Sequence, residues 1–299
     1  MTILRTSFQP LRRLATAVFA LGLAAVISTD VAANSDKARR IVAIGGSISE
    51  IVFALGEDAR LIARDSTSIF PEKVADLPNV GYMRALSPEG VLSVDPDLII
   101  ALEGSGPPEA VAVLRSADIP YAVVREAFSR AGIVEKVRAV GEALGVETKA
   151  SALAADLDRQ LAAAEAEAQI VGVKKKVLFI LSLRGGKILA SGSGTAADGI
   201  IRMAGGVNAI SGFPGYKQLT DEAVITAAPD VVLMMDRGGG HTAPAEAPLD
   251  HPAIRSTPAA GTQSVVRMNG QYLLGFGPRT AAAVRDLHAA LYAPRPVPQ

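Results

Sequence analysis

Residues Glu147–Ile170 read ETKASALAADLDRQLAAAEAEAQI, and this stretch decides how the chain divides. Apolar residues recur along it at the spacing of one helix face: Ala150, Leu153, Ala154, Leu157 and Leu161. It contains neither Gly nor Pro, and a continuous helix of this length would span roughly 35 Å. We expect this helix to bridge two domains; an ordinary crossover helix inside one large sheet is the alternative interpretation.

Short apolar runs rich in β-branched residues lie on both sides of this helix. Four precede it and three follow it: Ile41–Ile44, Leu61–Ala63, Leu98–Ala101 and Tyr121–Val124, then Val177–Leu181, Val231–Met235 and Val265–Met268. Apolar runs that alternate with helical patterns indicate mostly parallel sheets buried on both faces. The fold class that we predict is α/β, with two Rossmann-like lobes, residues 34–146 and 171–299, joined by one long rigid helix over residues 147–170.

An internal repeat supports two similar lobes. Ser87–Leu92 (SPEGVL) leads to Asp95–Ile100 (DPDLII), and Thr220–Ile225 (TDEAVI) leads to Ala228–Leu233 (APDVVL), with a constant offset of 133 residues. Each copy starts with a Ser or Thr helix cap, places Glu in the first turn, ends the helix before Pro-Asp and enters a strand. Two similar lobes joined by a rigid helix enclose a cleft, and we expect the ligand to bind there.

The first 33 residues have the pattern of a secretory signal peptide. Three arginines precede an apolar run over Leu14–Ile27, and Val31–Ala33 follows as the cleavage site. The run is shorter than the stretch of about 20 apolar residues that a spanning helix needs. We expect cleavage after Ala33 and export to the periplasm as a monomer that does not insert into the membrane; an uncleaved membrane anchor is the alternative.

The composition excludes several classes of function. The 299 residues include 30 basic and 30 acidic side chains, so the chain lacks the basic excess of a nucleic-acid-binding protein. It has no cysteine, which rules out disulfides, thiolate metal sites, cysteine nucleophiles and an N-terminal lipid-modified cysteine. Its three histidines, His241, His251 and His288, form no HxxxH or HxH pair, which argues against a metal site built from several histidines.

Two glycine-rich segments resemble phosphate-binding loops but lack the rest of such a motif. Gly45–Ser49 (GGSIS) and Gly192–Thr195 (GSGT) continue into neither GxGxxG nor a GK[ST] loop. The chain has no GxSxG nucleophile elbow either. We interpret both segments as tight turns between a strand and a helix, and we expect that the protein is not an enzyme.

The segment that stands out chemically is Asn79–Ser87, NVGYMRALS, a loop before a helix cap that should face the cleft. By itself a loop tyrosine such as Tyr82 is more often a packing residue. Arg84 lies two residues away, and a guanidinium close to a phenol favours the phenolate form. A phenolate is a hard anionic oxygen ligand suited to ferric iron, and tyrosine is a known axial ligand of haem.

With this segment the sequence resembles the periplasmic haem-binding proteins of bacterial haem ABC importers, over about Arg40 to Tyr292. The part most specific to that family is Val80–Ser87, VGYMRALS. Further segments carry the resemblance: Ile44–Gly56, Thr195–Asp198, Gly205–Ala209 and Gly215–Lys217. The first and third of these also resemble siderophore- and cobalamin-binding relatives.

The resemblance implies roles for five residues. Tyr82 would be the axial ligand of the haem iron, and Arg84 would hydrogen-bond the oxygen of Tyr82. Arg237, just after the Val-Val-Leu-Met-Met strand, would meet the other face of the haem or a propionate. Glu89 and Glu222, in the first turns of the repeated helices, match positions that dock on arginines of the permease; compensation of the helix dipole would also place a glutamate there.

The function implied is that of a substrate-binding protein that captures ferric protoporphyrin IX haem as the transported ligand. It would deliver this haem to an inner-membrane ABC permease with its ATPase, and ligand exchange at iron would be the whole reaction. One alternative is a siderophore- or cobalamin-binding protein of the same fold, in which Tyr82 packs or hydrogen-bonds. A secreted α/β enzyme is another, and the missing nucleophile motif argues against it.

Overall fold

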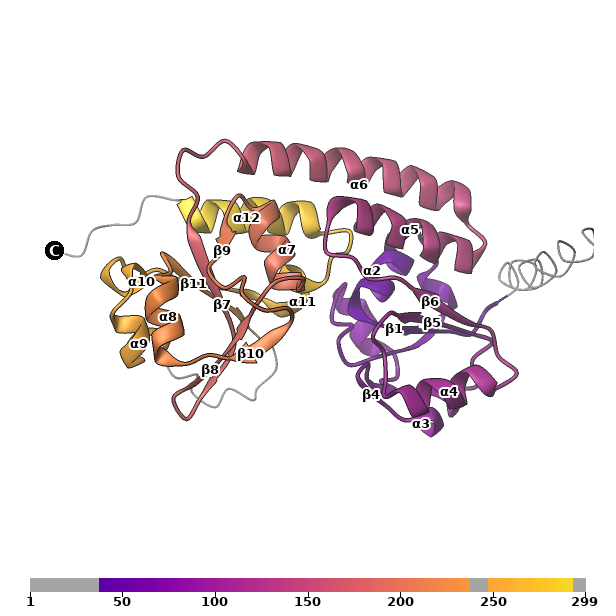
Figure 1. The fold of residues 1–299 in the computed structure, drawn as a ribbon. Helices are drawn as coiled ribbons and strands as arrows, with labels where there is room; N and C mark the ends of the chain where they lie inside the picture. The colour runs from indigo at the N-terminus through magenta and orange to yellow at the C-terminus, as the bar shows by residue number, and fades with distance from the viewer. Residues whose placement is uncertain (1–37, 237–246, 293–299) are drawn as a thin grey trace, which may run out of the picture.

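A computed structural model describes residues 38–236 and 247–292, which form two α/β lobes beneath one long helix (Figure 1). The predicted signal peptide, residues 1–33, lies outside the described residues. Each lobe is a sheet with helices on both of its faces. Here, residues 38–144 are called the first lobe and residues 176–292 the second lobe.

The first lobe is built on a parallel sheet with the strand order β2-β1-β5-β6. Its strands are β1 (Ile41–Ile44), β2 (Leu61–Arg64), β5 (Leu98–Leu102) and β6 (Tyr121–Val124). Its helices are α2 (Gly46–Ala54), α3 (Pro88–Leu92), α4 (Pro108–Ser116) and α5 (Arg130–Leu144), with single 3-10 turns at Asp58–Arg60 and Glu72–Asp76. A separate hairpin consists of β3 (Gly81–Tyr82) and β4 (Ala85–Leu86). The four predicted strands are confirmed, and β1 and β5 are buried throughout because helices cover both faces.

The second lobe is a six-stranded mixed sheet with the order β10-β8-β7-β11-β12, and β9 pairs with the start of β7. Its strands are β7 (Lys176–Arg184), β8 (Lys187–Ser191), β9 (Val207–Asn208), β10 (Tyr216–Gln218), β11 (Val231–Asp236) and β12 (Val265–Asn269). Its helices are α7 (Ala196–Met203), α8 (Asp221–Ala227), α9 (Pro252–Arg255), α10 (Pro258–Gly261), α11 (Gly270–Leu274) and α12 (Thr280–Tyr292), with a 3-10 turn at Pro248–Asp250. The three predicted strands β7, β11 and β12 run parallel, whereas β8 and β10 form an antiparallel edge that the prediction missed.

The internal repeat has the same structure in both lobes. Ser87 caps α3 and Thr220 caps α8, each through its side-chain oxygen. At the end of each copy an aspartate joins two neighbouring strands: Asp97 N donates to Arg40 O at 2.9 Å, and the Arg40 N–H donates back to the Asp97 carboxylate at 2.8 Å. Asp230 and Lys176 form the same pair of bonds at 2.8 Å each. The Pro-Asp sequence therefore aligns the first strands of both sheets.

The long helix α6 (Glu147–Ala168) spans both lobes and ends two residues before its predicted end (Figure 1). It packs against α5 of the first lobe and α12 of the second. Leu157 belongs to the core of the first lobe, and one turn later Leu161 belongs to the core of the second. The apolar stripe of α6 is therefore shared between two cores.

The glycine-rich segment after β1 is a turn, as its sequence predicts. Gly45 has a φ of +110° and immediately precedes the first residue of α2. A Cβ atom at this position would lie 2.8 Å from Leu102 Cβ. Both the backbone conformation and the close approach of the next strand therefore require glycine here.

Gly141 provides a test of how closely α5 and α6 must pack. A methyl group added at Gly141 would overlap the side chain of Ala150 on α6. On an exposed helix surface, Gly→Ala would stabilise by up to about 1 kcal/mol. We expect Gly141→Ala instead to lower the free energy of unfolding by roughly 1–3 kcal/mol, because it forces the two helices apart.

Chemical denaturation with matched m-values measures this change. Gly172→Ala is the control, because a Cβ there meets no atom within 4 Å. Its effect should stay within about 0.5 kcal/mol. A Gly141→Ala protein as stable as the parent would show that the contact between α5 and α6 is loose.

Candidate functional site

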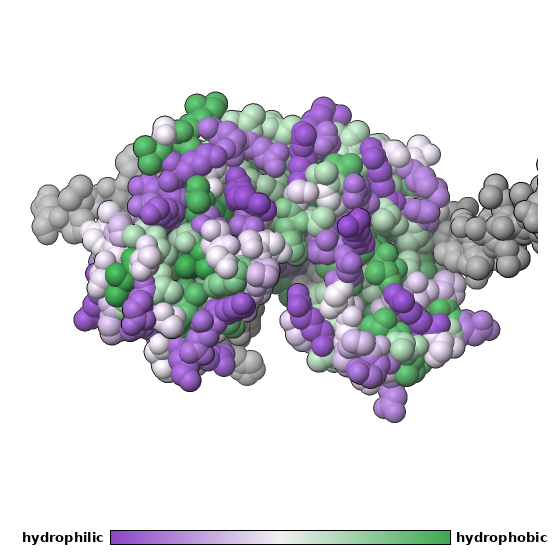
Figure 2. Space-filling model, viewed as in Figure 1, coloured by the Kyte–Doolittle hydropathy of each residue, from purple (hydrophilic) through white to green (hydrophobic). Residues whose placement is uncertain are grey.

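A cleft separates the two lobes on the side away from α6 (Figure 2). In Figure 1, β4 of the first lobe and β10 of the second lie on the sides of the lobes that face each other. The residues singled out by the sequence, Tyr82 and Arg84, belong to the hairpin that contains β4. The hairpin thus reaches the edge of this cleft.

The hairpin exposes Tyr82 because its other apolar side chains are buried. Val80, Met83 and Leu86 pack into the core of the first lobe. Tyr82 remains 47% exposed, and Arg84 is exposed beside it. The VGYMRAL pattern therefore anchors the loop on three apolar residues and presents one aromatic and one cationic side chain outward.

Backbone hydrogen bonds tie this hairpin to two neighbouring loops. Ser66 N, after β2, donates to Gly81 O at 2.8 Å. Gly106, after β5, donates to Met83 O and accepts from Leu86 N, both at 2.8 Å. Tyr82 is therefore held by the loops that follow two strands of the parallel sheet, where binding residues of such sheets gather.

The side chains of Tyr82 and Arg84 form no hydrogen bond or ion pair with any residue in the described ranges. Arg237, the third predicted ligand contact, lies outside those ranges. The positive charge of Arg84 instead contributes to the pKa of Tyr216 in the second lobe, which it lowers. The guanidinium of Arg84 therefore lies near enough to Tyr216 to lower the pKa of that phenol.

Tyr216 is the second-lobe aromatic residue of the site. It lies on β10, is 38% exposed, and packs edge-on against Phe179 with ring centroids 6.5 Å apart. Burial raises the pKa of Tyr216, while hydrogen bonds from Thr195 and Ala197 and the positive charge of Arg84 act in the opposite direction. In the sequence analysis, Tyr216 appears only within Gly215–Lys217, one of the segments that carry the family resemblance, and it has no assigned role.

The predicted docking residues, Glu89 and Glu222, are exposed in the first turns of α3 and α8. A hydrogen bond from its own backbone N–H and another from Thr220 lower the pKa of Glu222. Glu222 therefore assists the cap of α8, and both carboxylates remain accessible.

Two side chains of the second lobe cross to the first lobe above the cleft. Gln271 Oε1 accepts a hydrogen bond from Ile69 N at 3.0 Å, and its Nε2 donates to Gly46 O at 3.1 Å. Arg279 Nε donates to the buried carboxylate of Glu50 at 2.6 Å. Neither Gln271 nor Arg279 was identified from the sequence, since no local pattern indicates a partner more than 200 residues away.

Lys136 adds a buried charge to the contact between the two lobes. Its side chain is fully buried on α5, lies 2.6 Å from Glu126 Oε1, and donates to Phe276 O of the second lobe at 3.0 Å. Burial lowers the pKa of Lys136 and raises those of Glu126 and Glu50. A lysine on the apolar face of α5 was the sequence signal that could have revealed this contact.

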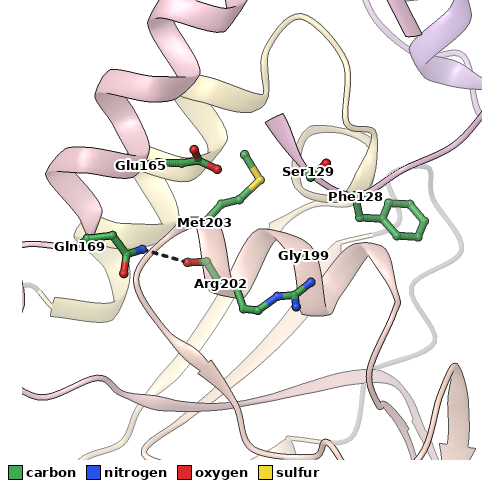
Figure 3. Close-up of a pocket in the computed structure, with 7 residues that line it drawn as sticks. All are labelled: Phe128, Ser129, Glu165, Gln169, Gly199, Arg202 and Met203. Carbon is green, nitrogen blue, oxygen red and sulfur yellow. Dashed lines mark hydrogen bonds between the residues drawn. The ribbon is translucent and has the colours of Figure 1, made fainter. Parts of the chain in front are cut away.

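A second hollow, of about 460 Å³, lies beneath α6 (Figure 3). It is lined by Phe128, Ser129, Glu165, Gln169, Gly199, Arg202 and Met203. Gln169 Nε2 closes one end by donating to Arg202 O at 3.2 Å. None of the residues selected from the sequence lines this hollow.

The described residues contain no cluster of three or more His, Asp or Glu side chains placed to hold a metal ion. His251 pairs with Gly186 O at 3.0 Å and His288 with Ala204 O at 3.1 Å, so both have structural partners. No helix within residues 38–236 and 247–292 is long and apolar enough to cross a membrane.

Two α/β lobes, a single helix that joins them and an aromatic site at the cleft define a two-lobed binding protein. The profile of the periplasmic binding protein family matches residues 41–272. The chain belongs to that family.

Solved structures similar to this chain include the periplasmic heme-binding protein BhuT in complex with two hemes. It is 40% identical with a TM-score of 0.77, and the match covers 84% of this chain and 97% of BhuT. The periplasmic heme-binding protein RhuT from Roseiflexus sp. RS-1 is 38% identical with a TM-score of 0.80, covering 85% and 98% of the two chains. A vitamin B12-binding protein of Vibrio campbellii is 28% identical, over 72% of this chain and 76% of its own length.

The proximity of Arg84 and Tyr216 can be measured by titration. Because the guanidinium lowers the pKa of Tyr216, Arg84→Ala should move the titration of this phenol to higher pH. Tyrosinate absorbance, taken as the difference from the matching Tyr216→Phe protein, isolates the one phenol.

Arg115→Ala is the matched control, because the guanidinium of Arg115 lies over the ring of Tyr121 and its charge lowers the pKa of that phenol instead. It should leave the titration of Tyr216 unchanged. An Arg84→Ala protein in which Tyr216 titrates as in the parent would mean that the two lobes do not approach each other here.

Proposed function

We propose that this protein binds haem in the cleft and delivers it to an inner-membrane ABC permease with its ATPase. The observation that carries the proposal is the hairpin that holds Tyr82. Its apolar neighbours are buried, and its phenol oxygen has no partner among the described residues. An exposed oxygen ligand on a well-anchored loop is the arrangement that a metal-centred ligand requires.

The residues around Tyr82 suit a flat, largely apolar ligand with an iron centre. A phenolate oxygen is a hard ligand for ferric iron, and the guanidinium of Arg84, two residues away, would donate a hydrogen bond to that oxygen. Ile69 and Phe70 of the first lobe and Tyr216 of the second are large hydrophobic or aromatic side chains that remain partly exposed, and they would offer apolar surface to such a ligand. Affinity would come from the bond to iron together with burial of both porphyrin faces.

The relatives support this choice of ligand. The two solved structures named above are heme-binding proteins and are matched over nearly their whole length at 40% and 38% identity. Vitamin B12-binding relatives share less identity. Each of these proteins is named for what it binds, which supports a binding function rather than catalysis.

The proposal also includes export and docking. Residues 1–33 would be removed as a signal peptide, and the remaining chain would act in the periplasm as a monomer divided into residues 34–146, 147–170 and 171–299. Arg237 would contact the second face of the haem or a propionate. Glu89 and Glu222, one on each lobe, would meet arginines of the permease.

Tyr82→Ala should weaken haem binding by roughly 100-fold or more, because the bond to iron is lost. The charge-transfer band between phenolate and ferric iron should disappear. Arg84→Ala should still bind haem, but several-fold more weakly, because the ligating oxygen of Tyr82 loses a hydrogen-bond donor. Visible-absorbance titration of the purified protein with ferric haem measures both effects.

Tyr82→Phe keeps the ring and removes only the oxygen, so it separates ligation from packing. Tyr121→Phe, another tyrosine of the first lobe, is the control and should bind as the parent does. An unchanged spectrum in Tyr82→Phe would refute the ligand assignment. A parent protein that binds cyanocobalamin and not haem would favour the alternative ligand.

Charge reversal at both docking positions, Glu89→Lys with Glu222→Lys, should leave the haem titration unchanged and abolish uptake through the cognate permease. Either change alone should reduce transport partially, because the other lobe still docks. Haem-dependent growth, paired with the spectroscopic titration, measures both properties.

Glu135→Lys with Glu147→Lys is the matched control. Both glutamates are exposed on α5 and α6, and Glu147 also lies in the first turn of its helix. This control should transport normally. Normal transport by the Glu89 and Glu222 double variant would disprove docking at these positions.

A further inference from the structure

We propose that Gln271 and Arg279 of the second lobe are positioning residues for the Tyr82 hairpin of the first lobe. They act through the segment Asp65–Phe70, which follows β2. The effect on the hairpin stands on its own, whereas the effect on haem rests on the proposed function.

Both residues contact the same end of this segment, at Ile69 and Phe70. Gln271 Oε1 accepts a hydrogen bond from Ile69 N at 3.0 Å. Its Nε2 donates to Gly46 O at 3.1 Å, and this second bond fixes the orientation of the side-chain amide. The Arg279 guanidinium lies over the ring of Phe70, 3.7 Å from its centroid. The second lobe therefore holds one backbone group and one aromatic ring of the first lobe.

Arg279 is itself held in place by a buried partner. Its Nε donates to Glu50 at 2.6 Å, and Glu50 is almost fully buried on α2. A guanidinium between a carboxylate and an aromatic face uses both its donors and its flat surface. Lysine would keep the charge at this position and lose the planar stacking on Phe70.

The segment is rigid between its two ends. The buried carboxylate of Asp65 accepts from Gly45 N and from Ser68 Oγ, both at 3.0 Å. Ser68 also shares a 2.7 Å hydrogen bond with Ser49 on α2. Because these buried polar groups satisfy one another, they hold the segment and the start of α2 together as one unit.

The other end of the segment holds the Tyr82 hairpin. Ser66 N donates to Gly81 O at 2.8 Å, and Arg64, the last residue of β2 just before the segment, accepts from Val80 N at 2.9 Å. A shift of Ile69 and Phe70 therefore reaches the residue just before Tyr82 through one rigid unit. The relative position of the two lobes sets where the phenol oxygen lies.

Hydrogen exchange tests this coupling without any ligand. In Gln271→Ala and Arg279→Ala the amides of Ser66 and Val80 should exchange about tenfold faster than in the parent. The reference is the amide of Gly215 in the second lobe, which donates to Ser193 O at 3.0 Å and should not change. Arg279→Lys should give an intermediate rate, because it keeps the ion pair alone.

Arg285→Ala is the matched control on α12. It removes an exposed ion pair with Glu167, 3.0 Å long, and should change neither set of amides. Equal acceleration at Ser66, Val80 and Gly215 would indicate general destabilisation and would overturn the proposal. So would unchanged exchange at Ser66 and Val80.

Haem dissociation provides the second readout. In Gln271→Ala and Arg279→Ala haem should leave several-fold faster, while the phenolate charge-transfer band persists because Tyr82 remains. Unchanged dissociation rates would overturn the role in binding. If the parent protein binds no haem at all, the proposed function fails, and the exchange measurements still decide whether the two residues position the hairpin.

Discussion

The packing of α6 on both lobes is the constraint on which the rest of the structure depends. Its buried stripe contributes Leu157 to one core and Leu161 to the other, so neither lobe can complete its core without the same helix. Gly141 brings α5 into direct contact with α6, and α12 packs along the far end. A single shared helix of 22 residues therefore places the two sheets side by side and leaves a cleft on the opposite side.

A buried set of charges beneath α6 makes this arrangement specific. Lys136 pairs with Glu126 and bonds Phe276 O, while Arg279 pairs with Glu50. Buried ion pairs contribute little net stability, because desolvation offsets their attraction, but leaving one partner unpaired costs about 3–5 kcal/mol. Lobe orientations that separate Arg279 from Glu50 would leave a buried carboxylate unpaired, so this contact disfavours them.

The site is built from loops that this rigid frame positions. Tyr82 and Arg84 lie on the β3–β4 hairpin, the segment Asp65–Phe70 follows β2 of the first sheet, and Tyr216 is on the edge strand of the second. Helices and sheets fix the positions of the loops relative to one another. The loops carry the side chains that would contact a ligand, and such side chains can differ between proteins without disturbing the cores. The proteins similar to this chain include a heme-binding and a vitamin B12-binding protein, which is consistent with loops that vary on a similar frame.

Local sequence patterns predicted the seven principal strands and the bridging helix, and the structure confirms both. Continuous apolar runs favour strands buried on both faces, and a Gly- and Pro-free pattern with apolar residues on one face favours a continuous helix. That Val80, Met83 and Leu86 are buried while Tyr82 stays exposed is seen only in the structure. Only the tertiary structure decided that Gln271 reaches Ile69, 202 residues away, and that Arg279 reaches Glu50, 229 residues away. It also decided that β8 and β10 form the edge of the second sheet, because β10 is exposed along its length and carries no apolar pattern. Contacts of this kind depend on the path of the whole chain, and local periodicity carries no information about that path.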